Sequence, residues 1–254
     1  GHDLGVALSD LELVLEAVNT RFAGSLMFSE FQAESIVTSL TQSWSEGMGS
    51  ATVVTAGTGM GKTLGFAIPV VADALIANRS SGRVCSQLLV YPRNDLAKDQ
   101  YSEIRETVKQ VNKALIVSGQ SERCLGIAID ADGRVLSKQE KFPSAPGAPA
   151  APAWGIGGTN VYSGASSTYG GSKPASIVAC SVESFRRRLR IPEVCRGLRT
   201  LQRVVFDEVH LSSGTQGGHH SRIVSRCKQI ASREGNRLTF MGISATIAKP
   251  RDHV

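Results

Sequence analysis

The sequence predicts an α/β fold in which helices cover both faces of a mostly parallel sheet. The 254 residues are long enough for one large domain or two small ones, and a hydrophobic content of 41% is enough for a sizeable core. Apolar runs of strand length alternate with helical patterns through most of the chain. A glycine-rich stretch follows the first of these runs and leads into a helical pattern, which is typical of a strand–loop–helix unit.

Sequence periodicity locates the elements of the first half. Apolar residues recur at helical spacing in two segments near the N-terminus, where Ser9 and Ser29 are candidate helix caps. Two short apolar runs follow, each with a helical pattern directly behind it. The expected elements are helices at residues 10–21, 29–44, 61–77 and about 94–113, and strands at residues 51–55 and 87–91.

The second half continues this alternation after an interruption at residues 119–176. Prolines and many Gly, Ala and Ser residues occur there, a composition that cannot bury enough apolar surface to offset its ordering entropy. We expect a flexible Pro/Gly/Ser-rich insertion, with a small hairpin at residues 126–137 around Asp132 and Gly133. The remaining strands are expected at residues 176–180, 203–206 and 238–243, and the expected organisation is an N-terminal helical extension (1–27) followed by one domain (28–254) that carries the insertion.

Composition and charge limit the classes of function. The formal net charge of +6 favours a polyanionic partner or reflects an ordinary basic surface, and charge alone does not decide between them. The five cysteines are scattered without a C-x-x-C pair, which argues against a disulfide framework or a cysteine-rich zinc site and for reduced thiols in a cytoplasmic protein. No apolar run approaches the roughly 18 residues of a membrane span, so we expect no membrane contact.

The segment T-A-G-T-G-M-G-K-T, residues 55–63, is typical of a phosphate-binding loop. It stands between a strand and a helix, so backbone N–H groups and the helix N-terminus can cradle phosphate oxygens. Lys62 would reach the β- and γ-phosphates, and the Thr63 hydroxyl would ligate Mg²⁺. Ala56 replaces the usual first glycine, and a simple glycine-rich turn is the alternative. The candidate nucleotide-binding residues are Ala56, Gly57, Thr58, Gly59, Met60, Gly61, Lys62 and Thr63.

A second segment, L-Q-R-V-V-F-D-E-V-H at residues 201–210, would supply carboxylates to the same site. An apolar strand delivers Asp207 and Glu208 at its C-terminal end, where open parallel sheets bind their ligands. Asp207 would hold Mg²⁺ through water, and Glu208 would polarise the attacking water. An Asp-Glu pair after a strand is also a common helix start, but its pairing with Lys62 and Thr63 favours ATP and Mg²⁺ as ligands.

Together these segments resemble the first RecA-like P-loop ATPase domain of a superfamily 2 helicase of the DExH type, over about residues 28–247 without the insertion. The resemblance implies an adenine contact by Gln32 in F-S-E-F-Q. It also implies that Ser244 and Thr246 in G-I-S-A-T-I couple hydrolysis to strand movement. The catalytic candidates of the family pattern are Lys62, Asp207, Glu208 and His210, the last residue of the D-E-V-H box.

The same resemblance implies a track for nucleic acid. L-L-V-Y-P-R-N-D-L-A-K-D-Q, residues 88–100, resembles motif Ia and contributes Arg93 and Asn94. I-V-A-C-S-V-E-S-F, residues 177–185, lies at the place of motif Ib, and the run F-R-R-R-L-R overlaps its end. On a helix Arg186 and Arg190 would share one face, and we expect them to contact phosphates and not bases. A solvated helix face is the alternative for this run.

Two segments, residues 91–100 and 207–220, are similar to large bacterial helicases of the Ski2-like and MrfA-like kind, a group that includes helicase subunits of phage-defence (DISARM-type) systems. The sequence therefore predicts an ATP-dependent motor domain that acts on DNA more readily than on RNA. We expect it to be part of a larger protein or complex, since no second RecA-like domain follows G-I-S-A-T-I, the segment that resembles motif III. The alternatives are a nucleotide-gated binding or scaffold module and, less favoured, a small-molecule P-loop kinase.

Overall fold

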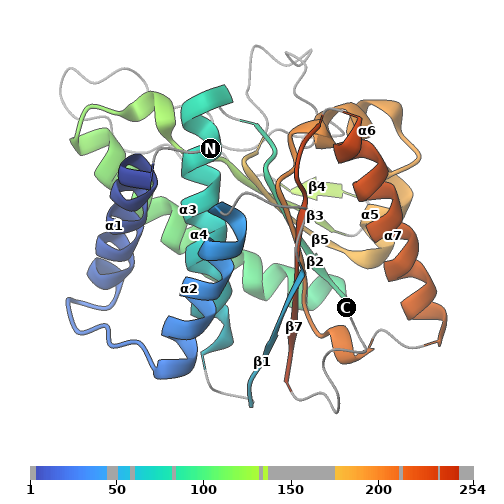
Figure 1. The fold of residues 1–254 in the computed structure, drawn as a ribbon, viewed down its shortest axis with the longest axis horizontal. Helices are drawn as coiled ribbons and strands as arrows, with labels where there is room; N and C mark the ends of the chain where they lie inside the picture. Colours follow the sequence, from blue (N-terminus) through green and yellow to red (C-terminus); the bar gives the residue numbers. More distant parts are fainter. Residues whose placement is uncertain are drawn as a thin grey trace.

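A seven-stranded sheet forms the centre of the computed structural model, which describes residues 4–44, 51–57, 61–81, 84–131, 134–136, 175–211, 214–233 and 235–245. The strand order is β1-β7-β6-β2-β5-β3-β4, and every neighbouring pair is parallel except β3 with β4 (Figure 1). The strands are β1 (Ala51–Thr55), β2 (Gln87–Tyr91), β3 (Ile127–Ala131), β4 (Arg134–Leu136), β5 (Ile177–Ser181), β6 (Arg203–Phe206) and β7 (Thr239–Ser244).

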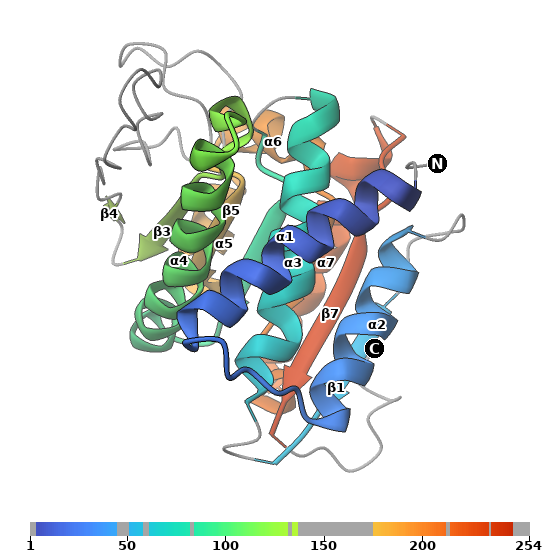
Figure 2. The ribbon, with the colours of Figure 1, turned by 90° about the vertical axis from the view of Figure 1, so that its left-hand side faces the viewer.

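Helices cover both faces of this sheet. The first four helices lie on one face, where α1 crosses over α3 and α4 as an outer helix (Figure 2), and the last three lie on the other face (Figure 1). Leu89 and Tyr91 of β2 point into the core on the side of the first four helices, whereas Leu88 and Val90 point to the other side. The helices are α1 (Leu4–Arg21), α2 (Glu30–Trp44), α3 (Lys62–Ser81), α4 (Asn94–Val117), α5 (Val182–Arg188), α6 (Pro192–Gly197) and α7 (Gly214–Ser232).

The six parallel strands end at one common edge of the sheet, and the predicted site residues follow those ends. The glycine loop follows β1, Asp207 follows β6, and Ser244 is the last residue of β7. Arg93 comes shortly after β2, whose last residue, Tyr91, pairs with Ser181 at the end of β5. The strand order therefore divides this edge into a part at β1, β7 and β6 and a neighbouring part at β2 and β5.

The predicted fold class, a mostly parallel sheet with helices on both faces, is confirmed. Three strands have the predicted bounds, 51–55, 87–91 and 203–206. The first helix begins at Leu4, so Ser9 lies inside it and the prediction that Ser9 caps it is wrong. Ser29 does precede α2, and its Oγ accepts a hydrogen bond from the N–H of Gln32 at 3.3 Å.

The predicted start of the insertion at residue 119 is wrong. The predicted hairpin is present as β3 and β4, but β3 also pairs with β5 and so belongs to the central sheet. Leu125, Ile127 and Ile129 are buried in the core next to the first four helices. The composition was misleading because the long Pro/Gly/Ser-rich stretch dilutes this short apolar run. Residues 137–174, the rest of the expected insertion, lie outside the described residues.

The helix of the expected N-terminal extension packs on the same core as the rest of the chain. Val14, Ala17 and Val18 of α1 are buried against α3 and α4. Over the part of the chain that the structure describes, we find no helix with the length and apolar character required to cross a membrane.

Candidate functional site

The glycine loop leaves β1 and enters α3 at the strand-end edge of the sheet. Ala56 donates a hydrogen bond from its N–H to the carbonyl of Ser244 at 3.3 Å, which ties the start of the loop to the end of β7. Gly61 has φ +68°, and a Cβ there would lie 2.4 Å from Nε2 of Gln32. Only glycine fits this position without a shift of its neighbours. Thr58, Gly59 and Met60 lie outside the described residues.

Both polar atoms of the Gln32 side-chain amide form hydrogen bonds to other parts of the chain. Its Oε1 accepts a hydrogen bond from the N–H of Ser29 at 2.9 Å, which completes the capping box of α2. Its Nε2 donates to the carbonyl of Gly61 at 3.0 Å. Gln32 therefore fixes the end of the glycine loop to the N-terminus of α2, and its contact with adenine stays a prediction.

Lys62 and Thr63 begin α3, next to the loop. The Lys62 ammonium donates to the carbonyl of Ala56 at 3.1 Å, so it is held against the loop that a phosphate would enter. The Thr63 hydroxyl donates to Oε1 of Gln100 on α4 at 3.2 Å. Gln100 was not predicted as a site residue, although it is the last residue of the motif Ia segment. The pair connects the first turn of α3 with the helix that begins just after Arg93.

Asp207 lies where β6 ends, and its carboxyl group is unusually hard to ionise. Burial raises its pKa to about 6, and the nearby Glu208 carboxylate adds to this increase. A hydrogen bond from the N–H of Glu208 to Oδ1, at 2.9 Å, and the nearby side chains of Lys62 and His210 act in the opposite direction. The start of the glycine loop is bonded to the end of β7, and β6 pairs with β7, so the glycine loop and the D-E-V-H box follow neighbouring strand ends.

His210 connects Glu208 with the end of β7. Nδ1 of His210 lies 3.1 Å from Oε2 of Glu208 and 2.9 Å from Oγ of Ser244, which is fully buried. Glu208 has φ +52°, a backbone conformation that a non-glycine residue adopts only at some cost in energy. The Glu208 carboxylate that contacts His210 thus belongs to a residue in a strained turn. Thr246, the other predicted coupling residue, lies outside the described residues.

Two of the predicted nucleic-acid residues, Arg93 and Asn94, follow β2 at the neighbouring part of the same edge, and the other two belong to α5 and the turn after it. Arg93 is exposed just before α4, and Asn94 is the first residue of that helix. Arg186 lies in α5 and forms two hydrogen bonds to the Glu183 carboxylate, at 3.0 and 2.9 Å. The prediction that Arg186 and Arg190 share a helix face is wrong, because α5 ends at Arg188 and Arg190 lies in the following turn.

A comparison with protein families supports the sequence resemblance over part of the chain. Residues 29–129 match the DEAD/DEAH box helicase family, a range that includes the glycine loop and α4. This match covers less than half of the chain. We found no match among curated protein sequences.

Solved structures of helicases have the same fold. The DUF1998 helicase MrfA superposes with a TM-score of 0.62 at 19% identity, over 95% of this chain and 30% of that one. The helicase Lhr of Mycobacterium smegmatis, bound to ssDNA and AMP-PNP, superposes with a TM-score of 0.61 at 20% identity. The superposition covers 95% of this chain and 25% of that one. The DEAD-box helicase Mss116, bound to ssRNA and UDP-BeF, superposes with a TM-score of 0.61 at 15% identity. The superposition covers 94% of this chain and 39% of that one.

The RecA-like helicase fold of the chain is therefore established. The chain spans well under half of the length of each of these three structures. The family match and the three solved structures thus all come from helicases.

Proposed function

We propose that this chain is the ATP-binding half of an ATP-dependent nucleic-acid helicase or translocase. The observation that carries the proposal is the meeting of three segments at one edge of the sheet. Ala56 at the start of the glycine loop is bonded to Ser244, and His210 lies between Glu208 and Ser244. A phosphate-binding lysine, a carboxylate for a cation and a carboxylate for water are the parts that phosphoryl transfer to water needs.

The residues at the start of α3 and at the end of β6 fit a nucleoside triphosphate with its magnesium ion. Lys62 would exchange the neutral carbonyl of Ala56 for phosphate oxygens, next to the positive N-terminus of α3. The Thr63 hydroxyl and the Asp207 carboxylate are the oxygen ligands that Mg²⁺ prefers. Burial makes the charge of Asp207 costly, and a divalent cation at this position would offset that cost. When bound, Mg²⁺ would neutralise charge on the phosphates.

Glu208 would orient the attacking water and accept its proton. His210 would hold the Glu208 side chain and would carry any change at that carboxylate to Ser244 on β7. Gln32 would set the position of Gly61, and Gln100 would set the position of the Thr63 hydroxyl. In this arrangement the nucleotide site is linked to α4, which carries Asn94 at its start.

Single-stranded nucleic acid is the proposed partner, bound through its phosphates at Arg93, Asn94, Arg186 and Arg190. DNA is favoured over RNA because the segments around Arg93 and His210 are similar to MrfA-like helicases, and both MrfA and Lhr have been solved with DNA. Mss116, in contrast, was solved with ssRNA. A role in phage defence and the presence of further domains or subunits are part of the same proposal and rest on the sequence resemblance.

A Glu208→Gln variant tests the proposed function. The amide keeps the shape of the side chain but cannot accept a proton from water, so ATP hydrolysis stimulated by nucleic acid should fall by roughly 10² to 10⁴. ATP binding, measured by calorimetry, should be preserved in this variant. Lys62→Ala is the contrasting variant, and it should lose nucleotide binding because the phosphates lose their loop cation.

The outcomes separate the proposal from its alternative. Hydrolysis by Glu208→Gln at the parent rate would show that Glu208 is not the base. If the parent protein binds ATP and changes its affinity for nucleic acid without hydrolysing ATP, the chain is a nucleotide-gated binding module and not a motor. Unchanged ATP affinity in Lys62→Ala would remove the glycine loop from the site.

A further inference from the structure

One hydrogen bond joins the start of α3 to α4, and it sets the orientation of the Thr63 hydroxyl. The hydroxyl donates its proton to Oε1 of Gln100 at 3.2 Å. A hydroxyl group carries one proton and two oxygen lone pairs. Because its proton is directed to Gln100, Thr63 can offer its lone pairs to a cation such as Mg²⁺, which prefers oxygen ligands.

Gln100 belongs to a helix that is anchored along its length. Ala97, Ile104 and Val108 of α4 are buried in the core between the sheet and the first four helices. α4 contacts α3, and α1 crosses over both helices (Figure 2). Gln100 is half-buried between these anchored positions. Its side-chain amide is therefore held opposite the first turn of α3, where Thr63 lies.

The same helix begins at the residues proposed to contact nucleic acid. Arg93 is exposed just before α4, and its carbonyl accepts a hydrogen bond from the N–H of Ala97 at 3.1 Å. Asn94 is the first residue of α4, and Gln100 follows six residues later. A helix rises about 1.5 Å per residue, so these two positions lie about 9 Å apart along the axis. One rigid element thus connects the proposed phosphate contacts with the Thr63 hydroxyl.

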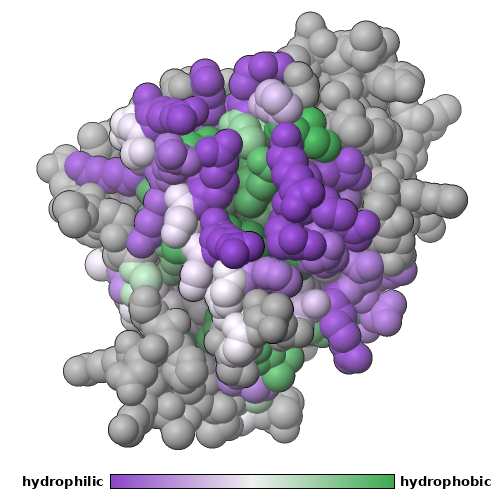
Figure 3. Space-filling view, turned by 90° about the vertical axis from the view of Figure 1, so that its right-hand side faces the viewer, coloured by the Kyte–Doolittle hydropathy of each residue, from purple (hydrophilic) through white to green (hydrophobic). Residues whose placement is uncertain are grey.

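The contact between Thr63 and Gln100 lies on one face of the sheet. Figure 3 shows the opposite face, which α5, α6 and α7 cover, with hydrophilic side chains on both sides of a strip of hydrophobic ones. The contact is also separate from the one between His210 and Ser244, which lies at the end of β7. The route through α4 is therefore a second connection to the nucleotide site, independent of β7.

We propose that Gln100 is a positioning residue that couples nucleic acid at the start of α4 to the magnesium ion of the nucleotide site. This inference rests on the proposed function and assigns that site a route of regulation within this chain. When Arg93 and Asn94 hold phosphates, they fix α4, and Gln100 keeps the Thr63 hydroxyl oriented for the cation. Less ordering then opposes metal binding. Single-stranded nucleic acid therefore raises the affinity for ATP with Mg²⁺, and by linkage the nucleotide raises the affinity for nucleic acid by the same factor.

The test compares the same substitution at two half-buried glutamines of α4. Gln100→Leu removes the acceptor of the Thr63 hydroxyl, whereas Gln110→Leu removes a side chain that donates to Glu106 of the same helix at 3.4 Å. Calorimetry with the full chain measures ATP affinity at several Mg²⁺ concentrations. Loss of one neutral hydrogen bond should make Gln100→Leu require about 2- to 10-fold more Mg²⁺ for the same ATP affinity. Gln110→Leu should match the parent.

A single-stranded DNA oligonucleotide added to the same titrations measures the coupling. In the parent protein it should raise the ATP affinity in the presence of Mg²⁺ by about fivefold or more, the lower end of typical coupling between sites. This factor should fall towards 1 in Gln100→Leu and stay unchanged in Gln110→Leu. Gln100→Glu keeps an acceptor oxygen and has no side-chain N–H, so it should retain the coupling.

Two results would overturn this inference while the proposed function stands. One is a parent protein that binds ATP with Mg²⁺ but gains no ATP affinity from the oligonucleotide. The other is a Gln100→Leu variant that behaves like Gln110→Leu. A parent protein whose ATP affinity does not depend on Mg²⁺ would overturn both the inference and the proposed function. Thermal unfolding checks the folding of each variant, and Gln100→Ala with Gln110→Ala as its control replaces the Leu pair if Gln100→Leu does not fold.

Discussion

At the scale of single residues, Asp207 carries its charge in a place where burial makes that charge costly. Its pKa in the folded protein is about 6, compared with 3.8 for a free side chain. The protonated carboxyl therefore stabilises the folded state below about pH 4, and this contribution is lost as the pH rises through about 6. The nucleotide-free protein should be less stable at neutral pH than it would be with an uncharged residue at this position.

Asp207→Asn should accordingly stabilise the nucleotide-free protein at neutral pH. The amide oxygen can still accept the hydrogen bond from the N–H of Glu208, and the buried charge is gone. The pKa difference corresponds to roughly 1 to 3 kcal/mol in the free energy of unfolding by urea. The gain should shrink as the pH falls from about 7.5 towards 4. Asp99→Asn, an exposed change on α4, is the control and should alter stability by less than about 0.5 kcal/mol.

The opposite result would contradict the electrostatic account. If Asp207→Asn destabilises the protein at neutral pH, hydrogen bonds and charges of the folded protein already compensate the buried carboxylate. Added ATP and Mg²⁺ give an independent check, because ligand binding to the folded state raises stability. This stabilisation should be large for the parent protein and small for the Asn variant.

The places of the candidate site residues in the fold were predictable because each one follows a short apolar run. Lys62, Thr63, Asp207 and Glu208 stand at strand ends, and parallel strands bring their ends to one edge. Gln100 was missed because its partner, Thr63, is 37 residues away and the contact exists only once α3 and α4 pack. The bridge from His210 to Ser244 spans 34 residues and depends on the pairing of β6 with β7.

At the scale of elements, the sequence located strands well where an apolar run stands alone between polar or glycine-rich segments. It located the β3–β4 hairpin but placed it in an insertion outside the central sheet, because the Pro/Gly/Ser-rich composition was averaged over residues 119–176. In the structure the backbone of Leu125 is held from both sides by Asn112 of α4, which accepts from its N–H at 2.7 Å and donates to its carbonyl at 3.2 Å. This long-range contact fixes the segment before β3, and no local pattern in the sequence shows it.

Leu125→Ala should therefore be strongly destabilising, although the residue lies inside the range that composition marks as dispensable. Leu125 is fully buried, and the missing methyl groups and the cavity they leave should cost about 2 to 5 kcal/mol in the free energy of unfolding. Replacement of residues 144–172 by a short Gly-Ser linker is the matched change in the same range. It should shift that free energy by no more than about 1 kcal/mol, because loop entropy depends only weakly on length.

Urea unfolding of the two variants decides between the expected and the observed start of the insertion. A cost below about 1 kcal/mol for Leu125→Ala would mean that the segment before β3 contributes little to the core. A large loss of stability in the linker variant would show that residues 144–172 pack on the domain and that their composition was a poor guide to their role.

At the scale of the whole molecule, a buried carboxylate joins distant parts of the chain. Asp10 of α1 is almost completely buried. It accepts two hydrogen bonds of 2.7 Å from the guanidinium of Arg79 on α3, and a further one from Nη2 of Arg123. Arg123 in turn lies in the short helix before β3. The sequence alone places Asp10 at the start of the first helix, because nothing local indicates partners 69 and 113 residues away.

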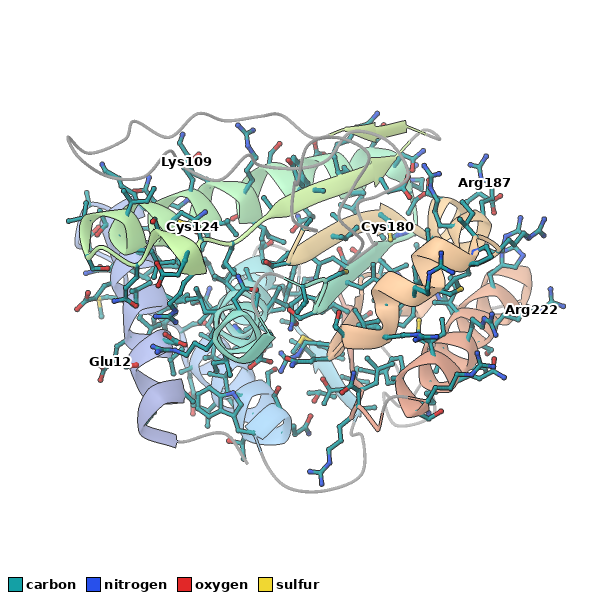
Figure 4. The ribbon with its side chains drawn as sticks, turned by 90° about the horizontal axis from the view of Figure 1, so that it is seen from above. Glu12, Lys109, Cys124, Cys180, Arg187 and Arg222 are labelled. Carbon is teal, nitrogen blue, oxygen red and sulfur yellow. The ribbon has the colours of Figure 1, made fainter. Side chains whose placement is uncertain are left out.

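Asp10→Ala should destabilise the domain by about 3 to 5 kcal/mol, because it leaves the guanidinium of Arg123 buried without its carboxylate. Glu12→Ala, on the exposed side of the same helix (Figure 4), removes an equal charge and should cost less than about 0.5 kcal/mol. Urea unfolding gives both values, and hydrogen exchange of α1 shows whether this helix opens separately. If Asp10→Ala lowers the free energy of unfolding as little as Glu12→Ala does, α1 contributes little to the stability of the domain. The expected large cost would instead make residues 1–27 an integral part of the domain, so that a domain cut at residue 28 would lack part of its own core.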